Sequence, residues 1–256
     1  MLSAVAVLGL RQMSRRTVFP GARFAVPSDQ ELARQGLEPL DYRTLDGIAL
    51  RGFWAEPDRP DAPVVVYFHG NAETADQNFD LAAVLDQAGF GVLLAEYRGY
   101  AGLGGSPTEQ GLYRDGQAAV EAVVARGIDD DRVVLVGRSL GTGVAVELAH
   151  RGLGRGLVLV SPYTSMTDMA RPLVGPLAPL LVPDRFDSEA RARSVRVPAA
   201  VIHGTADDLV PFAMGEAMAR SLPRGRLVPV PGAGHIGIPG LADLIAREVA
   251  AVAAGR

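Results

Sequence analysis

The chain has 256 residues, of which 48% are hydrophobic and 21% charged, and its net charge is −4 at pH 7. This composition allows a sizeable core in one large domain and excludes an intrinsically disordered chain. The acidic balance argues against nucleic acid as a partner, because nucleic-acid-binding domains carry a basic surplus. The absence of cysteine excludes disulfides, thiolate catalysis and cysteine-based zinc sites.

Residues 1–36 form an N-terminal segment ahead of the single domain that we expect over residues 37–256. The segment opens with an apolar run of about ten residues, followed by Arg11, Arg15 and Arg16. This run is too short for a transmembrane helix, and a secretory signal carries its basic residues before the run. Three interpretations are open: a short helix lying on the domain, a peripheral membrane contact, or the remnant of a longer anchor. We therefore expect a cytoplasmic protein that is membrane-associated if this segment touches a bilayer.

From residue 48 onward, short apolar runs alternate with longer segments of helical character. Several runs are continuously apolar, as strands buried on both faces of a parallel sheet are. The pattern predicts an α/β fold with a mostly parallel, doubly wound sheet and helices on both faces. The expected strands are Ile48–Ala55, Val64–Phe68, Gly91–Ala95, Val133–Val136, Leu157–Val160, Ala199–Ile202 and Leu227–Val230, and the expected helices span about 75–88, 109–126, 140–151, 212–221 and 239–253.

One connection is much longer than the others. Nearly forty residues separate the strand that ends at Val160 from the strand that begins at Ala199. A connection of this length in a compact domain is usually functional or has structure of its own, and we expect a short lid at about 162–196. Its apolar side chains either line a pocket for an acyl or other apolar group or only cover the sheet. The pocket candidates are Met166, Met169, Leu173 and Leu177.

Ser139 lies between a predicted strand and a predicted helix, in the sequence Gly137-Arg138-Ser139-Leu140-Gly141. The G-x-S-x-G pattern requires this context, because its serine occupies a strained strand-to-helix turn that lifts Oγ above the sheet. The N-terminus of the following helix favours negative charge that develops beside it. We therefore predict that Ser139 is a nucleophile.

A serine hydroxyl needs a base that takes its proton and an acid that orients the base. His235 follows the last predicted strand in a loop that is free to reach Ser139, whereas His150 ends the helix that starts there. We predict His235 as the base; the alternative is a loop histidine that is hydrogen-bonded locally. Asp207 and Asp208 both follow a strand end, and we predict Asp207 as the acid, with Asp208 as its solvated neighbour or a helix N-cap. The chain order serine, aspartate, histidine is that of α/β-hydrolases.

An oxyanion in acyl transfer needs two backbone donors. We predict the Leu140 amide as the first, because it follows the nucleophile. The second should come from the loop His69-Gly70-Asn71-Ala72, which follows the strand Val64–Phe68. We predict the Asn71 amide, with Ala72 as second choice; an ordinary Gly-Asn turn is the alternative. The four histidines lack metal-ligand spacing, so no metal and no cofactor are expected.

Six motifs resemble a known family. HGNAE, EYRGY…GGSPTEQGLYRD, GRSLGTGVA, SPYTS, HGTADDLVP and GAGH, in this order and spacing, resemble the BEM46-like branch of the α/β-hydrolase superfamily. The resemblance runs from about residue 37 to the C-terminus. It implies the α/β-hydrolase fold, an intact Ser139–Asp207–His235 triad and an oxyanion loop at Asn71. Members resemble esterases, lipases and thioesterases; some eukaryotic relatives remove palmitoyl groups from proteins, and many have an N-terminal hydrophobic anchor.

These residues lead us to expect a metal-free serine hydrolase that cleaves carboxylic esters or thioesters. Its substrate would be a small-molecule or lipid-like ester with an apolar acyl group. An aminopeptidase-like amide hydrolase is one alternative; it would need acidic side chains for the substrate's amine, and Glu73 and Asp168 are the candidates. A non-catalytic binding module that keeps the fold is the other alternative.

Overall fold

The computed structural model describes Phe19 and residues 27–256. The strands within this part of the chain are β1 (Glu38–Arg43), β2 (Ala49–Ala55), β3 (Val64–Phe68), β4 (Gly91–Ala95), β5 (Val133–Arg138), β6 (Gly156–Val160), β7 (Ala199–Gly204) and β8 (Gly225–Val230). They form one sheet in the order β1-β2-β4-β3-β5-β6-β7-β8. β2 pairs antiparallel with both β1 and β4, and all the other pairs are parallel. This is the mostly parallel sheet that the sequence predicts.

The central strands are apolar along their whole length because both faces of the sheet are covered. In β3, Val64, Val66 and Phe68 pack in one core cluster, whereas Val65 and Tyr67 pack in a second. Side chains alternate between the two faces of a sheet, so a continuous apolar run fills both layers at once. The other parallel strands divide between the clusters in the same way.

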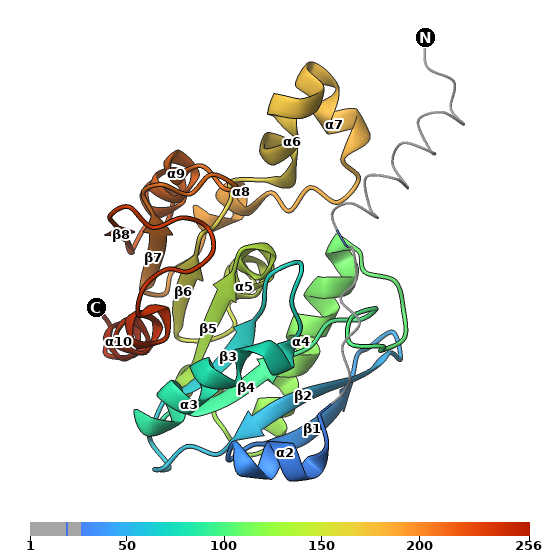
Figure 1. Cartoon of the computed structure of the whole chain (residues 1–256), viewed down its shortest axis with the longest axis vertical. Coiled ribbons are helices and arrows are strands. Elements are labelled where there is room, and N and C mark those ends of the chain that lie inside the picture. The colour runs from blue at the N-terminus through green and yellow to red at the C-terminus, as the bar shows by residue number, and fades with distance from the viewer. Residues whose placement is uncertain (1–18, 20–26) are drawn as a thin grey trace.

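The helices cover the sheet on both faces, as Figure 1 shows. α4 (Glu109–Ala125), α5 (Leu140–His150), α8 (Ser188–Ala192) and α9 (Phe212–Ser221) pack on one another and on one face. α3 (Phe79–Gln87) and α10 (Leu241–Ala253) pack together on the other. Short 3₁₀ turns, η1 (Ala75–Asn78) and η2 (Asp130–Arg132), precede α3 and β5. The sheet is therefore doubly wound, and the prediction of the fold class is confirmed.

α2 (Asp29–Arg34) leads into the edge strand β1. Its first turn is a capping box, in which the Ser28 hydroxyl accepts from the Glu31 amide and the Glu31 carboxylate accepts from the Ser28 amide. The predictions for residues 1–36 fall mainly on residues 1–18 and 20–26, which lie outside the described residues. Among those that are described, no helix has the length and apolarity needed to cross a membrane.

The long connection after β6 has structure of its own. α6 (Met166–Val174), η3 (Gly175–Leu177) and α7 (Ala178–Leu181) follow one another, and Figure 1 shows α6 and α7 projecting from the top of the molecule. The chain then returns through Phe186, which is fully buried, to α8, which packs on α5. The predicted lid therefore has a projecting part, α6 to α7, and a part that returns to the core at Phe186 and α8.

Candidate active site

Ser139 occupies a strained turn between β5 and α5. Its backbone angles are φ 49° and ψ −114°, a conformation that side-chain-bearing residues rarely adopt. Two glycines make the turn sterically possible. A Cβ at Gly137 would lie 2.5 Å from the Gly141 carbonyl oxygen, and a Cβ at Gly141 would lie 2.1 Å from the Phe68 carbonyl oxygen. Both flanking glycines of G-x-S-x-G are thus required by the close approach of backbone to backbone.

The structure brings Ser139, His235 and Asp207 into one chain of contacts. The Ser139 hydroxyl lies 3.1 Å from His235 Nε2, and His235 Nδ1 lies 2.9 Å from Asp207 Oδ2. Because a carboxylate oxygen only accepts, the proton of the neutral imidazole belongs on Nδ1, which leaves Nε2 free to accept from the serine. Asp208, in contrast, is exposed to solvent. The geometry therefore selects Asp207 of the two neighbouring aspartates.

The Asp207 side chain is fully buried and accepts several hydrogen bonds. Its Oδ1 accepts from the amides of Leu209 and Val210, at 3.0 and 2.8 Å. Burial alone would raise the pKa of Asp207, but the hydrogen bonds from His235 and from the Val210 amide outweigh it, so the pKa lies below the ordinary 3.8. The carboxylate is thus ionised at neutral pH, as an acid that orients an imidazole must be.

His203, the last but one residue of β7, is a further neighbour of this carboxylate. Its Nε2 lies 2.9 Å from the Val210 carbonyl and 3.2 Å from Asp207 Oδ2, and both groups are acceptors. Nε2 therefore carries a proton. Burial lowers the pKa of His203, so the ring is neutral and donates from Nε2. The sequence signal for this contact is a histidine that ends a strand four residues before the aspartate; sequence reasoning did not give it this role.

The two predicted oxyanion donors come from α5 and from the loop after β3. Leu140 is the first residue of α5, so its amide has no acceptor within the helix. Asn71 lies in the loop after β3, and its side-chain oxygen accepts from the Tyr100 hydroxyl at 2.9 Å. In the same loop, the Gly70 amide donates to Glu73 Oε1 at 2.5 Å. The Gly70 amide is therefore occupied, whereas those of Leu140 and Asn71 make no hydrogen bond with another described residue.

A buried ion pair of His69 and Glu96 holds the start of this loop. His69 Nε2 lies 2.7 Å from Glu96 Oε1, and Nδ1 lies 2.7 Å from the Gly70 carbonyl. Burial disfavours a charged imidazole, but the Glu96 carboxylate outweighs it and raises the pKa of His69 above the ordinary 6.5. The Tyr97 hydroxyl also donates to the His69 carbonyl at 3.1 Å. The start of the loop after β3 is thus held by the two side chains that directly follow β4.

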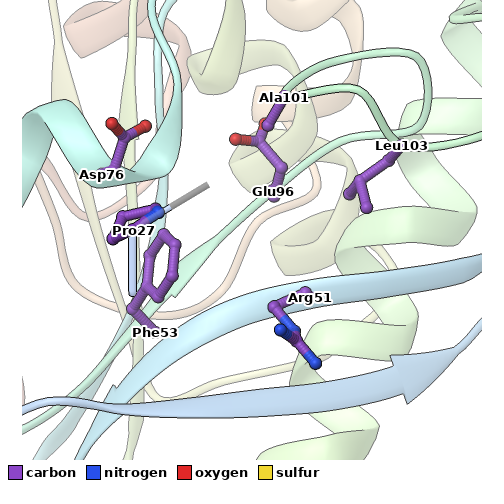
Figure 2. A pocket seen from close by; sticks show the side chains of 7 residues that line it. All are labelled: Pro27, Arg51, Phe53, Asp76, Glu96, Ala101 and Leu103. Carbon is purple, nitrogen blue, oxygen red and sulfur yellow. The ribbon is translucent and has the colours of Figure 1, made fainter. Parts of the chain in front are cut away.

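Glu96 also lines a small pocket, shown in Figure 2. There, Asp76 and Glu96 lie above Arg51 and Phe53, two side chains of β2. None of the three residues of the serine–histidine–aspartate contact lines this pocket. The pocket is therefore lined by β2 and by residues outside its sheet partners, and Ser139 has no part in it.

The predicted lid residues differ in their surroundings. Met166 and Met169 are half-buried and pack against the core cluster on the α5 side. Leu173 is 86% exposed and Leu177 is 47% exposed. Ile236, which follows His235, is also exposed at 81%. In this arrangement the two methionines face the body of the domain, and the two leucines of α6 and η3 face solvent.

Comparisons with known proteins agree with the geometry. Residues 59–184 match the family described as serine aminopeptidase, S33. The chain is 37% identical to the uncharacterized protein Rv2307c of Mycobacterium tuberculosis, over 91% of this chain and 84% of that protein. It is 30% identical to protein bem46 of Schizosaccharomyces pombe, over 76% of this chain and 69% of bem46. The chain belongs to the BEM46-like α/β-hydrolase family. It is therefore a hydrolase.

Other relatives of this BEM46-like hydrolase carry more specific names. It is 30% identical to the lysophosphatidylserine lipase ABHD12 of Danio rerio, over 65% of this chain and about half, 52%, of that lipase. Among solved structures, the Pyrococcus furiosus esterase Pf2001 gives a TM-score of 0.69 at 18% identity, over 91% of this chain and 99% of the esterase. Est1E of Butyrivibrio proteoclasticus, solved with ferulic acid bound, gives 0.64 at 20% identity, over 81% and 95%. At these identities the two solved structures show the fold.

Proposed function

We propose that this hydrolase cleaves carboxylic esters or thioesters through an acyl-enzyme intermediate on Ser139. The observation that carries the proposal is the unbroken contact from the Ser139 hydroxyl through His235 to the ionised, buried Asp207. A serine on a strained turn, a base with a free Nε2 and an orienting carboxylate are the parts that acyl transfer needs.

The reaction follows from these positions. His235 Nε2 takes the hydroxyl proton as Ser139 Oγ bonds to the substrate carbonyl carbon, and the oxyanion is received by the amides of Leu140 and Asn71. Collapse breaks the bond to the alcohol or thiol, which leaves with the proton from His235. Water then gives a proton to His235 and attacks the acyl-serine, and the carboxylic acid departs as Ser139 recovers its proton. Asp207 stays ionised throughout and stabilises the imidazolium.

We further propose that the acyl group is apolar. α6 follows the carboxyl end of β6, the parallel neighbour of β5, so α6 and α7 lie at the same edge of the sheet as Ser139. Exposed apolar side chains gather there: Leu173, Val174, Leu177 and Leu180. The lipase name of one relative is in line with such a substrate.

Aminopeptidase activity is the second candidate, because the matching family is described as serine aminopeptidase. Such an enzyme needs a carboxylate for the substrate's ammonium group. Glu73 is already engaged by the Gly70 amide and by Arg138. Asp168 accepts from the hydroxyls of Thr164 and Ser165 near the start of α6. Because both candidate carboxylates already have partners, the site favours ester or thioester substrates over aminoacyl amides.

The test uses Ser139→Ala with Ser106→Ala, an exposed serine outside the site, as the matched control. Both proteins and the wild type are assayed on p-nitrophenyl esters of increasing chain length, on acyl thioesters and on aminoacyl amides. We expect the wild type and S106A to turn over esters, with kcat/KM rising beyond acetate, and S139A to lose turnover with nearly the same thermal melt. Activity retained in S139A would refute the mechanism. Faster cleavage of aminoacyl amides would establish the second candidate, and failure of a fluorophosphonate probe to label the folded wild type would support a non-catalytic binding module.

A further inference from the structure

Two side chains join the oxyanion loop to the nucleophile turn. Glu73 Oε1 accepts from the Gly70 amide at 2.5 Å, and Arg138 Nη1 lies 3.2 Å from Glu73 Oε2. Arg138 directly precedes Ser139 at the end of β5, and Gly70 directly precedes Asn71. We call the contact between these two side chains the Arg138–Glu73 bridge. It links the backbone close to the Leu140 amide to the backbone next to the Asn71 amide.

The bridge lies largely inside the protein. The side chains of Arg138 and Glu73 are 21% and 18% exposed. Tyr67 of β3 lies fully buried close to both charges: burial raises its pKa, the Glu73 charge raises it further, and the Arg138 charge opposes. An ion pair that is largely withdrawn from water is screened less than a surface pair, so it holds its geometry better.

The Gly70 backbone lies close to the side chains of Glu73 and Ser139. A Cβ on Gly70 would lie 2.7 Å from Glu73 Oε1 and 3.5 Å from Ser139 Cβ. The loop therefore passes directly beside the nucleophile, and a small movement of Glu73 would move the Asn71 amide relative to Ser139. Since the Gly70 amide donates a hydrogen bond to Glu73, the carboxylate contacts the loop backbone directly and not through another side chain.

We propose that Glu73 and Arg138 are positioning residues, which fix the Asn71 amide opposite the Leu140 amide so that both point at the developing oxyanion. This inference rests on the proposed ester or thioester hydrolysis. Oxyanion donors act because they are held in place before the reaction begins, and an error of about 1 Å in such a site costs roughly 100-fold in rate. Loss of the bridge should therefore lower kcat and leave substrate binding nearly unchanged.

The experiment compares Glu73→Ala, Glu73→Gln, Arg138→Ala, Arg138→Lys and the double variant E73A/R138A. The control is Arg126→Ala, which removes another partly buried arginine whose partners, Glu38 and Glu56, are remote from Ser139 in the sheet. Steady-state kcat and KM on a p-nitrophenyl ester, the rate of fluorophosphonate labelling and the thermal melt are measured for each. R126A is expected to keep the wild-type kcat.

We expect E73A to lower kcat by roughly 30- to 100-fold, with KM within about twofold of the wild type and labelling slowed to a similar degree. The double variant should be no worse than E73A, because the two residues act as one unit. R138K should recover most of the loss seen in R138A, since an ammonium can still pair with Glu73. If E73A melts below the assay temperature, E73Q carries the test, because its carbonyl still accepts from Gly70 while the charge opposite Arg138 is gone.

A kcat of E73A or E73Q within twofold of the wild type would overturn the inference. So would a loss confined to KM, or a double variant whose loss equals the product of the two single losses. The failure of the proposed function has a different signature. In that case the wild type itself shows no Ser139-dependent turnover or labelling, whereas failure of this inference alone leaves Ser139-dependent turnover intact and unaffected by the bridge.

Discussion

Replacing Gly141 with alanine tests how the nucleophile turn is held. Gly141 is the second residue of α5, and it is buried. Considered only as a helix position, alanine is favoured over glycine by about 1 kcal/mol. Helix propensity therefore predicts that G141A is more stable than the wild type.

The packing around Gly141 predicts the opposite. The added Cβ would lie 2.1 Å from the Phe68 carbonyl oxygen and 2.8 Å from the His69 carbonyl oxygen, and both atoms are backbone. The first contact must open by about 0.9 Å to reach even 3.0 Å, the lower limit for a real Cβ contact. Overpacking costs about 1–3 kcal/mol, and a contact this short with backbone atoms belongs to the upper part of that range, about 2–3 kcal/mol. This cost exceeds the gain in helix propensity. The loop that moves is the one that carries Asn71.

We therefore expect G141A to lose about 1–2 kcal/mol of stability, which lowers Tm by about 2–8 °C in a chain of this size. A shift of the oxyanion loop by about 1 Å should lower kcat by roughly 100-fold. Thermal melts and ester kinetics measure both effects. Gly104→Ala is the control, because a Cβ there meets nothing within 4 Å. A G141A protein that melts at or above the wild-type temperature with kcat within twofold would refute the packing argument.

Two further predictions concern charge. The pKa of Asp207 lies below 3.8, so its contribution to stability is present above that pH and lost as the pH falls through the folded-state value. Protonation of Asp207 should accordingly leave no inflection in kcat/KM above about pH 4, and D207N should lower kcat/KM at pH 7 by about 10³–10⁴. An inflection above pH 4 that D207N removes, or a mild effect of D207N, would contradict this role. The raised pKa of His69 gives stability that is fully present below pH 6.5 and lost as the pH rises through the folded-state value. Urea unfolding should therefore show Glu96→Gln costing about 3 kcal/mol at pH 6 and less at pH 9, and an equal cost at both pH values would mean that His69 is neutral.

The parallel strands of the sheet could be predicted from sequence because strands buried on both faces have continuous apolar runs. β3 and β4 match the expected Val64–Phe68 and Gly91–Ala95 to the residue, and α9 matches 212–221. The edge strand β1 was not predicted. Its sequence EPLDYR contains a proline and three charged residues, and all of its side chains are exposed or half-buried. An edge strand of this kind is defined by its backbone pairing with β2, which leaves little trace in hydrophobicity.

The contact of Ser139 with His235 and Asp207 could be predicted, whereas the contacts that hold the loop after β3 could not. Ser139, Asp207 and His235 each follow a strand end, and strand ends in a parallel sheet converge at one edge. The Arg138–Glu73 bridge joins residues 65 positions apart, and the sequence around each of the two residues gives no sign of the contact.

The exposure of Leu173 could not be predicted either. The apolar pattern of α6 is real, but whether its outer residues face a pocket or solvent depends on how far the helix projects beyond the body.

The two halves of the site are held by different means. The backbone hydrogen-bond ladder continues one residue beyond β5, β6 and β7: the Ser139 amide donates to the Val160 carbonyl, the Ser161 amide to Ile202 and the Thr205 amide to Val230, all at 2.9–3.0 Å. The spacing of Ser139 and Asp207 is thus set by the register of the sheet.

The loop that carries Asn71 lies beyond the end of β3 and has no such ladder among the described residues; side chains hold it through Glu96, Tyr100 and the Arg138–Glu73 bridge. Under the proposed mechanism, we expect substitutions at these side chains to change the stabilisation of the transition state while the serine, histidine and aspartate stay in place. If so, variants of the bridge should change kcat without changing which residue the fluorophosphonate probe labels.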